Sequence, residues 1–306
     1  KRALTIAAVG RHHLLMVGSP GTGKSLLARA YRYILPPLSF SEAAEVTRVH
    51  SLAGFSNGDL VRSRPFRSPH HSTSMPALVG GSSLIKPGEI SLAHLGTLFL
   101  DELPEFRNEA LQSLREPLEE KKITIARARG HITYPADFQL IAAANPCRCG
   151  ELFNQSGKCE CRHGNALSQF SKLVGPFLDR IAIELNLNEL PQHLPATPIT
   201  TTEKARTSIS SARKYSQERN GKGILNSQFS VEKLYRLFEK IKPMRIYERY
   251  AQIEHLTMRS WVNTLRVALS IADLERTTPN EAHIMEAMQY RFLRKRLDAL
   301  RSLKAA

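Results

Sequence analysis

The sequence predicts an α/β domain, in which helices flank a parallel sheet, followed by a smaller all-helical domain. Before residue 190, short apolar runs alternate with amphipathic helical patterns, which is typical of parallel βα units. A stretch rich in proline and threonine comes next, and only helical patterns follow it. We therefore expect an α/β core at 1–190, a linker at 191–202 and a helical lid domain at 203–306.

The first chemical motif follows the apolar run His12–Val17. The next eight residues read Gly18-Ser19-Pro20-Gly21-Thr22-Gly23-Lys24-Ser25, and a helical pattern begins behind them. A strand, a glycine-rich turn and a helix start predict a phosphate-binding loop, because backbone N–H groups can then point at phosphate oxygens. We expect Lys24 to reach the β- and γ-phosphates of ATP and Ser25 to bind Mg²⁺. The residues expected to contact the nucleotide are Gly18, Ser19, Pro20, Gly21, Thr22, Gly23, Lys24, Ser25 and Leu26.

A carboxylate pair, Asp101-Glu102, ends the apolar run that begins at Thr97. A hydrolytic phosphate site needs one carboxylate for the metal and a second that polarises the attacking water. We expect Asp101 to hold Mg²⁺ and Glu102 to act on water. The alternative is an acidic helix start, which Glu102 would also suit.

A further apolar strand, 138–144, ends at Asn145-Pro146. An amide at the tip of a strand can hydrogen-bond the γ-phosphate or the attacking water, which is the role we expect for Asn145. The alternative is an asparagine that stabilises its own turn before proline.

Two insertions carry basic residues. The segment 54–89 is rich in Ser, His, Pro and Gly and contains Arg62, Arg64, Arg67 and Lys86. It also contains the pair His70-His71, for which we expect a structural or loop role rather than metal binding. The segment 121–134 alternates apolar and polar residues around Gly130, which predicts a β-hairpin. Arg127 and Arg129 have the same strand parity and are therefore candidates for DNA contact from one face. A surface hairpin with exposed arginines is the alternative.

All four cysteines lie in one short segment, as Cys147-Arg148-Cys149 and Cys159-Glu160-Cys161. Two close pairs joined by a polar loop can hold a tetrahedral Zn²⁺ through four thiolates, and His163 is a possible substitute ligand. We expect a structural zinc site in a reducing, cytoplasmic setting. A reduced cluster without metal is the alternative.

Helical patterns follow the linker at 203–219, 230–240, 246–254, 257–276 and 279–302. The last should begin with Thr278 as its cap and Pro279 in its first position. No apolar run approaches the roughly 18 residues of a membrane-spanning helix, so we expect no membrane association. The first residue is not methionine, and we interpret the chain as a piece of a longer polypeptide.

The formal net charge is +15, which favours polyanionic partners such as DNA. Residues 191–306 contain 21 basic and 11 acidic residues, so the smaller part of the chain carries most of the excess. A solvated basic surface without a partner explains the charge equally well.

Together these motifs resemble the AAA+ ATPases, and within them the magnesium-chelatase-like branch that includes the YifB or ComM subfamily. The most specific stretches are 64–71 (RPFRSPHH), 86–94 (KPGEISLAH) and 99–106 (FLDELPEF), and the resemblance covers nearly the whole chain. It implies a P-loop fold, a domain similar to the Lon protease domain ahead of Lys1, and a homo-oligomeric ring, usually a hexamer, with ATP bound between protomers.

The resemblance also implies roles for two arginines. Arg180 would act as an arginine finger in the neighbouring protomer's site, the alternative being an ion pair with Asp179 or Glu184. Arg259 matches the position of the arginine that contacts the γ-phosphate from the lid, although Thr257 stands where serine is commoner. The hairpin at 121–134 would face the central channel of the ring and hold a DNA backbone by charge.

The function that this resemblance implies is an ATP-hydrolysing motor that acts on single-stranded or branched DNA. A helicase that promotes branch migration during recombination or natural transformation would fit. The alternative is a chelatase- or chaperone-like ATPase that remodels a protein partner. A nucleotide-binding scaffold without hydrolysis is disfavoured by the presence of Lys24, Asp101, Glu102 and Arg180.

Overall fold

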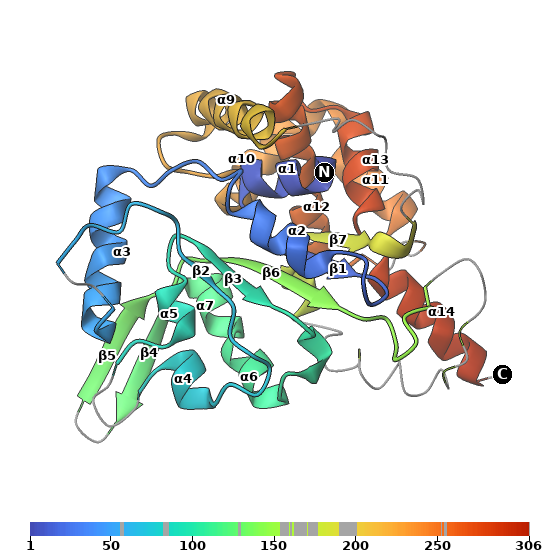
Figure 1. Cartoon of the computed structure of the whole chain (residues 1–306). Coiled ribbons are helices and arrows are strands. Elements are labelled where there is room, and N and C mark those ends of the chain that lie inside the picture. Colours follow the sequence, from blue (N-terminus) through green and yellow to red (C-terminus); the bar gives the residue numbers. More distant parts are fainter. Residues whose placement is uncertain are drawn as a thin grey trace. The chain divides into compact units, whose positions relative to one another are not determined.

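The computed structural model describes residues 1–55, 58–81, 86–127, 130–153, 159, 161, 170, 177–189, 201–251, 253 and 256–305. Figure 1 labels its helices and strands along the chain. The chain forms two compact units: the first joins Lys1–Lys24 to Asn145–Ala306, and the second is Ser25–Ala144. Residues 191–200 of the predicted linker at 191–202 lie outside the described residues.

The second unit contains short helices and a parallel sheet. Its helices are α2 (Lys24–Tyr31, whose first residue belongs to the first unit), α3 (Phe40–Ala53), α4 (Met75–Val79), α5 (Glu89–Leu92), the 3₁₀ turn η1 (Leu103–Glu105), α6 (Asn108–Ser113) and α7 (Arg115–Glu120). Its strands are β2 (Phe66–Arg67), β3 (Thr97–Leu100), β4 (Lys122–Arg127), β5 (Gly130–Pro135) and β6 (Gln139–Ala144).

Strand β3 lies between β2 and β6, and both pairings are parallel. Thr97 pairs with Gln139 and Leu100 with Ala142, so β3 and β6 run in register. Both strands are buried along their whole length, as expected for uninterrupted apolar runs in a parallel sheet. This register brings the end of β3, and with it Asp101, to the carboxyl edge of the sheet, where α/β proteins bind ligands.

The predicted hairpin is confirmed: β4 and β5 form a separate antiparallel pair, visible in Figure 1. In β4, Ile123 and Ile125 are buried and the alternating positions are exposed, whereas in β5 Tyr134 is buried and Ile132 is exposed. The ladder ends where Arg127 pairs with Gly130. Arg129 lies outside the described residues.

The first unit joins a parallel strand pair to the C-terminal helices. The pair is β1 (Leu14–Val17) and β7 (Ile183–Asn186), with Leu14 opposite Ile183. Its helices and 3₁₀ turns are α1 (Arg2–Gly10), η2 (Leu178–Arg180), η3 (Leu187–Glu189), α9 (Thr202–Asn220), η4 (Asn226–Gln228), α10 (Val231–Leu237), η5 (Glu239–Ile241), α11 (Pro243–Tyr250), α12 (Met258–Glu275), α13 (Glu281–Gln289) and α14 (Leu293–Ala305). Across the described residues, every helix is too short or too polar to traverse a bilayer.

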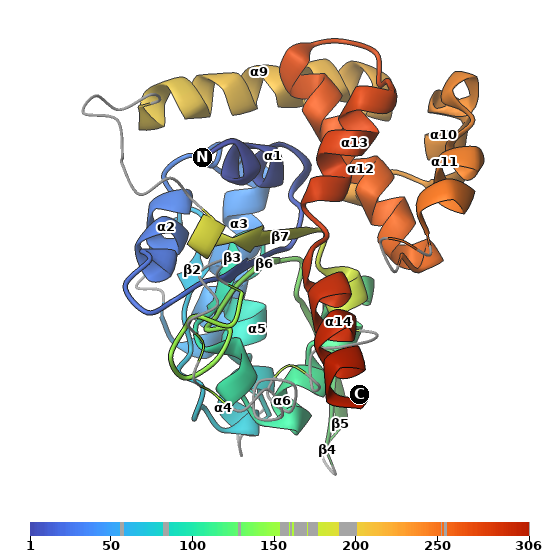
Figure 2. The same cartoon turned by 90° about the vertical axis from the view of Figure 1, so that its right-hand side faces the viewer.

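Helix α12 is the centre of this helical group and contacts α1, α9, α10 and α13 (Figure 2). It starts where predicted, because Thr257 and Ser260 form a reciprocal capping box. A buried polar chain runs through the group. His12 Nε2 lies 2.7 Å from Ser270 Oγ, and Asn226 bridges Ser270 to the fully buried Asp273. Burial holds the pKa of His12 down at about 3, so the ring is neutral in this chain of hydrogen bonds.

The predicted helix at 279–302 is wrong in two respects. Its first part starts at Glu281, because the Asn280 side chain accepts a hydrogen bond from His283 N and caps the helix there. It is also interrupted into α13 and α14. The carbonyl of Tyr290 accepts a hydrogen bond from Glu184 N, and the Glu184 carboxylate accepts one from Leu293 N. Tertiary pairing with β7 therefore replaces helical bonds at residues 290–293.

We expect Asp273→Ala to destabilise the first unit strongly. The Asp273 carboxylate accepts hydrogen bonds at 2.6 and 3.0 Å from both terminal nitrogens of Arg219, and its loss leaves that largely buried guanidinium without its counter-charge. The free energy of unfolding should fall by about 3–5 kcal/mol. Urea unfolding can be followed by the fluorescence of Trp261, which is the only tryptophan and is buried in α12.

Glu232→Ala is the matched control, because it removes a carboxylate that pairs with Arg236 on the solvent-exposed face of α10. That variant should lose less than about 0.5 kcal/mol. Equal losses in the two variants would contradict a structural role for the buried pair.

Candidate nucleotide site and cysteine cluster

The glycine-rich segment forms a loop between the buried strand β1 and the first residue of α2. Gly21 and Gly23 have φ angles of 82° and 83°, a left-handed conformation that side chains with a Cβ rarely adopt. These two glycines therefore allow the loop to turn tightly into the helix, whose positive N-terminal end favours an anion.

Polar contacts within the loop converge on Ser19 and Lys24. Lys24 Nζ donates hydrogen bonds to the carbonyls of Gly18 and Ser19, at 2.7 and 2.8 Å, and its side chain is buried. The Ser19 carbonyl also accepts from Thr22 Oγ1 at 2.8 Å. The ammonium thus lies over the loop, where phosphate oxygens would compete with these carbonyls for it.

In the second unit the structure brings Ser25 and Asp101 together. Ser25 Oγ donates to Asp101 Oδ2 at 2.6 Å, and the other oxygen of Asp101 accepts the backbone N–H of Glu102 at 3.0 Å. A hydroxyl and a carboxylate at this distance are oxygen ligands of the kind that Mg²⁺ prefers. These donors fit Mg²⁺.

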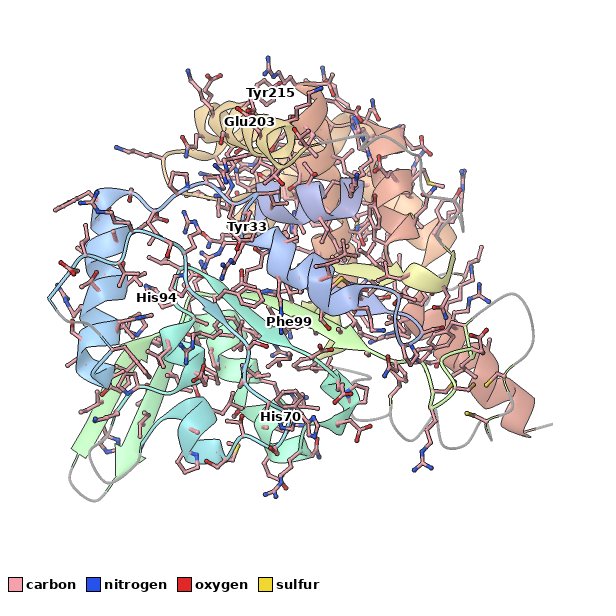
Figure 3. All side chains as sticks on the ribbon, in the orientation of Figure 1. Tyr33, His70, His94, Phe99, Glu203 and Tyr215 are labelled. Carbon is pink, nitrogen blue, oxygen red and sulfur yellow. The ribbon has the colours of Figure 1, made fainter. Side chains whose placement is uncertain are left out.

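Glu102 has an unusual backbone and a histidine partner that sequence reasoning missed. Its φ is 50°, which is uncommon for a residue other than glycine. Its carboxylate oxygen lies 3.2 Å from His71 Nδ1, and the His71 ring contacts His70 and Phe106. His70 lies on the loop after β2 (Figure 3). The sequence offered one signal, since both histidines lie in the distinctive 64–71 stretch.

The remaining candidates for nucleotide chemistry lie in the first unit. Asn145 directly follows β6 and is half-buried, Arg180 ends η2, and Arg259 is exposed in the first turn of α12. Turn η2 is tied to the helices, because the carbonyl of Asp179 accepts from Asn263 and its carboxylate accepts from Arg294.

Two arginines of the 54–89 insertion serve the fold. Arg64 donates to the carbonyls of Pro36 and Leu95, and Arg67 forms a two-pronged pair with Glu89 at 2.6 Å. Their charges are thereby engaged inside the second unit. Arg127 is the last residue of β4, but its side chain is outside what the structure describes, and Arg129 is outside the described residues.

The four cysteines converge as their spacing predicts. All four sulfurs lie within 4.8 Å of one another, and those of Cys147, Cys149 and Cys159 are 3.3, 3.6 and 3.7 Å apart. None is oxidised to a disulfide. Burial raises the pKa of Cys147 to about 12, whereas the backbone N–H of Glu151 lowers that of Cys149 to about 6. Cys149 is therefore more acidic than Cys147. His163 lies outside the described residues.

Comparison with known proteins agrees with this geometry. Residues 1–194 match the family model of magnesium chelatase, subunit ChlI, and residues 200–291 match that of its C-terminal region. The chain is 41% identical to the uncharacterized protein YifB of Salmonella typhimurium, covering 100% of this chain and 61% of YifB. It is 40% identical to the competence protein ComM of Haemophilus influenzae, covering 99% of this chain and 60% of ComM.

The magnesium-chelatase 67 kDa subunit of Heliobacterium mobile is more distant, at 27% identity over 48% of this chain and 26% of that subunit. The chain spans about three-fifths of the length of the YifB and ComM relatives. The phosphate loop, the parallel strands and both family matches lead to one conclusion: the chain belongs to the magnesium chelatase subunit ChlI family, a family of AAA+ ATPases.

Proposed function

We propose that this chain hydrolyses ATP in a homo-oligomeric ring and uses the energy to move DNA. The contact between Ser25 Oγ and Asp101 Oδ2, with Glu102 as the next residue, is the observation that carries the hydrolysis. In this proposal Lys24 and the N–H groups of the loop hold the phosphates. Ser25 and Asp101 hold Mg²⁺, which supplies positive charge to the phosphate oxygens. Glu102 accepts a proton from the attacking water.

The ring supplies the remaining groups in this proposal. Asn145 orients the water or the γ-phosphate, Arg259 contacts the γ-phosphate from the helical region, and Arg180 enters the site of the adjoining protomer. Two acids are the intramolecular alternatives for Arg180. Asp179 is held by Arg294 at 2.8 Å, and Glu184 lies 3.6 Å from Arg291. Both carboxylates thus have arginine contacts within the chain. A hexamer is the assembly we propose.

Glu102→Gln should bind nucleotide within about twofold of the original chain yet lose at least roughly 100-fold in ATP turnover, because an amide cannot accept the proton. Turnover is measured by phosphate release and binding by a fluorescent ATP analogue. Glu105→Gln is the matched control, since Glu105 is an exposed acid in the adjacent turn η1. Unchanged turnover in Glu102→Gln would remove Glu102 from the mechanism.

The DNA part of the proposal rests on charge, on the hairpin and on the relative named a competence protein. Strands β4 and β5 present alternating polar positions, and Arg127 closes the ladder at the tip. Contacts from such a tip to phosphates would be independent of base sequence and sensitive to salt. We propose single-stranded or branched DNA as the substrate and helicase-driven branch migration as the activity.

The double variant Arg127→Ala/Arg129→Ala should weaken DNA binding and flatten its salt dependence. Each lost phosphate contact reduces the slope of log K against log salt concentration by about 0.7–0.9. Fluorescence anisotropy with a labelled branched DNA across a salt series measures this slope. Lys233→Ala/Arg236→Ala is the control, because it removes the same charge from an exposed face of α10. Identical slopes in the two variants would assign the effect to net charge.

The match to a magnesium chelatase subunit favours a second candidate, an ATPase that remodels a protein partner. ATP turnover that is stimulated by a protein and indifferent to branched DNA at any salt concentration would establish this candidate in place of the first.

We also propose a structural Zn²⁺ bound by Cys147, Cys149, Cys159 and Cys161. Zinc–sulfur bonds of about 2.3 Å in a tetrahedron place the sulfurs about 3.8 Å apart. The separations of 3.3–3.7 Å among Cys147, Cys149 and Cys159 are close to that value and far above a disulfide bond of about 2.05 Å, and the sulfur of Cys161 lies within 4.8 Å of the other three. The donor set therefore fits zinc.

A further inference from the structure

The cysteine cluster contacts the phosphate loop through Gly150, the residue that follows Cys149. Gly150 N donates to the carbonyl of Cys147 at 3.1 Å, so this residue completes the turn that carries the first two thiols. Its φ is 83°, and a Cβ built there would lie 2.8 Å from Pro20 Cδ and from Ser19 Cβ. Only glycine allows the turn to pack this closely against the loop.

Hydrogen bonds fix this contact. The carbonyl of Gly150 accepts from Ser19 Oγ at 2.8 Å and from Asn188 Nδ2 at 2.9 Å. Asn188 Oδ1 in turn accepts from Ser19 N at 2.7 Å and lies 3.0 Å from Ser19 Oγ. Asn188 is in η3, directly behind strand β7. One asparagine thus binds the cysteine turn and the phosphate loop at once.

Ser19 also contacts Lys24. Its carbonyl accepts the hydrogen bond from Lys24 Nζ and also one from Thr22 Oγ1. A path of direct contacts therefore leads from the thiols through Gly150 and Ser19 to the ammonium that is to meet the phosphates. All residues of this path belong to the first unit.

We propose that metal at the four-cysteine site controls the affinity of the phosphate loop for nucleotide. This inference rests on the zinc site proposed above. The four sulfurs lie within 4.8 Å of one another. A cation bound to them would hold them together and would thereby fix the position of Gly150 and its carbonyl. When the cation leaves, the thiols are no longer drawn together, and the loop loses the support that places Ser19.

Coupling between two sites is reciprocal, so nucleotide must tighten metal binding by the factor by which metal tightens nucleotide binding. Such factors are typically 5–150, and we expect about tenfold here. The measurements are the Kd of a fluorescent ATP analogue with zinc-loaded and zinc-free chain, under reducing conditions, and the Kd of zinc against a chromophoric chelator with and without that analogue.

Ser19→Ala/Asn188→Ala removes both side-chain donors to the Gly150 carbonyl and leaves every cysteine in place. Its zinc content should remain one per chain, while the ratio of the two nucleotide Kd values falls from about ten to about one. Thr47→Ala is the control: Thr47 also bonds a loop, through Val61 N, but in the second unit, and the ratio should persist there.

Each outcome decides a separate point. Stoichiometric zinc with equal nucleotide Kd values in both metal states would overturn the coupling and leave the zinc site intact. A chain that binds no zinc under reducing conditions would overturn both, while hydrolysis is judged independently by Glu102→Gln. If the zinc-free chain loses its helical circular dichroism, its nucleotide Kd is not informative. The test is then made on the zinc-loaded chain, by measuring the Kd of zinc with and without nucleotide. Equal zinc Kd values would overturn the proposal.

Discussion

The position of Ser19 is the constraint on which the phosphate loop depends. Its N–H, its hydroxyl and its carbonyl are all engaged, with Asn188, Gly150 and Lys24 as partners. A backbone that approaches phosphates must leave many N–H groups unpaired, so its shape cannot come from helix or sheet bonds. Here neighbouring segments supply that shape from outside the loop. The loop is therefore only as well ordered as the cysteine turn and the strand end that support it.

Part of the positive charge is used inside the protein. Arg64 and Arg67 bond within the second unit, and Arg219, Arg291 and Arg294 pair with acids in the first. A guanidinium suits this use because its five donors satisfy several carbonyls and carboxylates in one plane. Net charge alone therefore does not say which basic side chains are available to a polyanion, and arguments for DNA contact need particular positions.

Local patterns predicted the parts of the fold whose causes are local. The glycine turn, the apolar strands and the hairpin each follow from residues next to one another, and α12 lies within the predicted helix at 257–276. The break between α13 and α14 was not predictable in this way, because it depends on Glu184, more than 100 residues earlier. The contact of His71 with Glu102 has the same origin: the loop after β2 and the end of β3 meet only in the folded sheet.

The side chain of Glu102 is exposed, yet its backbone and its carboxylate are both restrained by neighbouring groups. A left-handed backbone costs roughly 1–2 kcal/mol for a residue with a Cβ. Two local bonds offset this cost, one from Glu102 N to Asp101 and one from Glu105 N to the Glu102 carbonyl at 2.8 Å. His71 then limits the motion of the carboxylate, whose side chain remains 52% exposed. Burial would favour the protonated acid, which accepts no proton, and an unrestrained side chain would sample many positions. The water-activating role proposed for Glu102 would need the condition between these extremes, in which the acid is exposed but its position is limited.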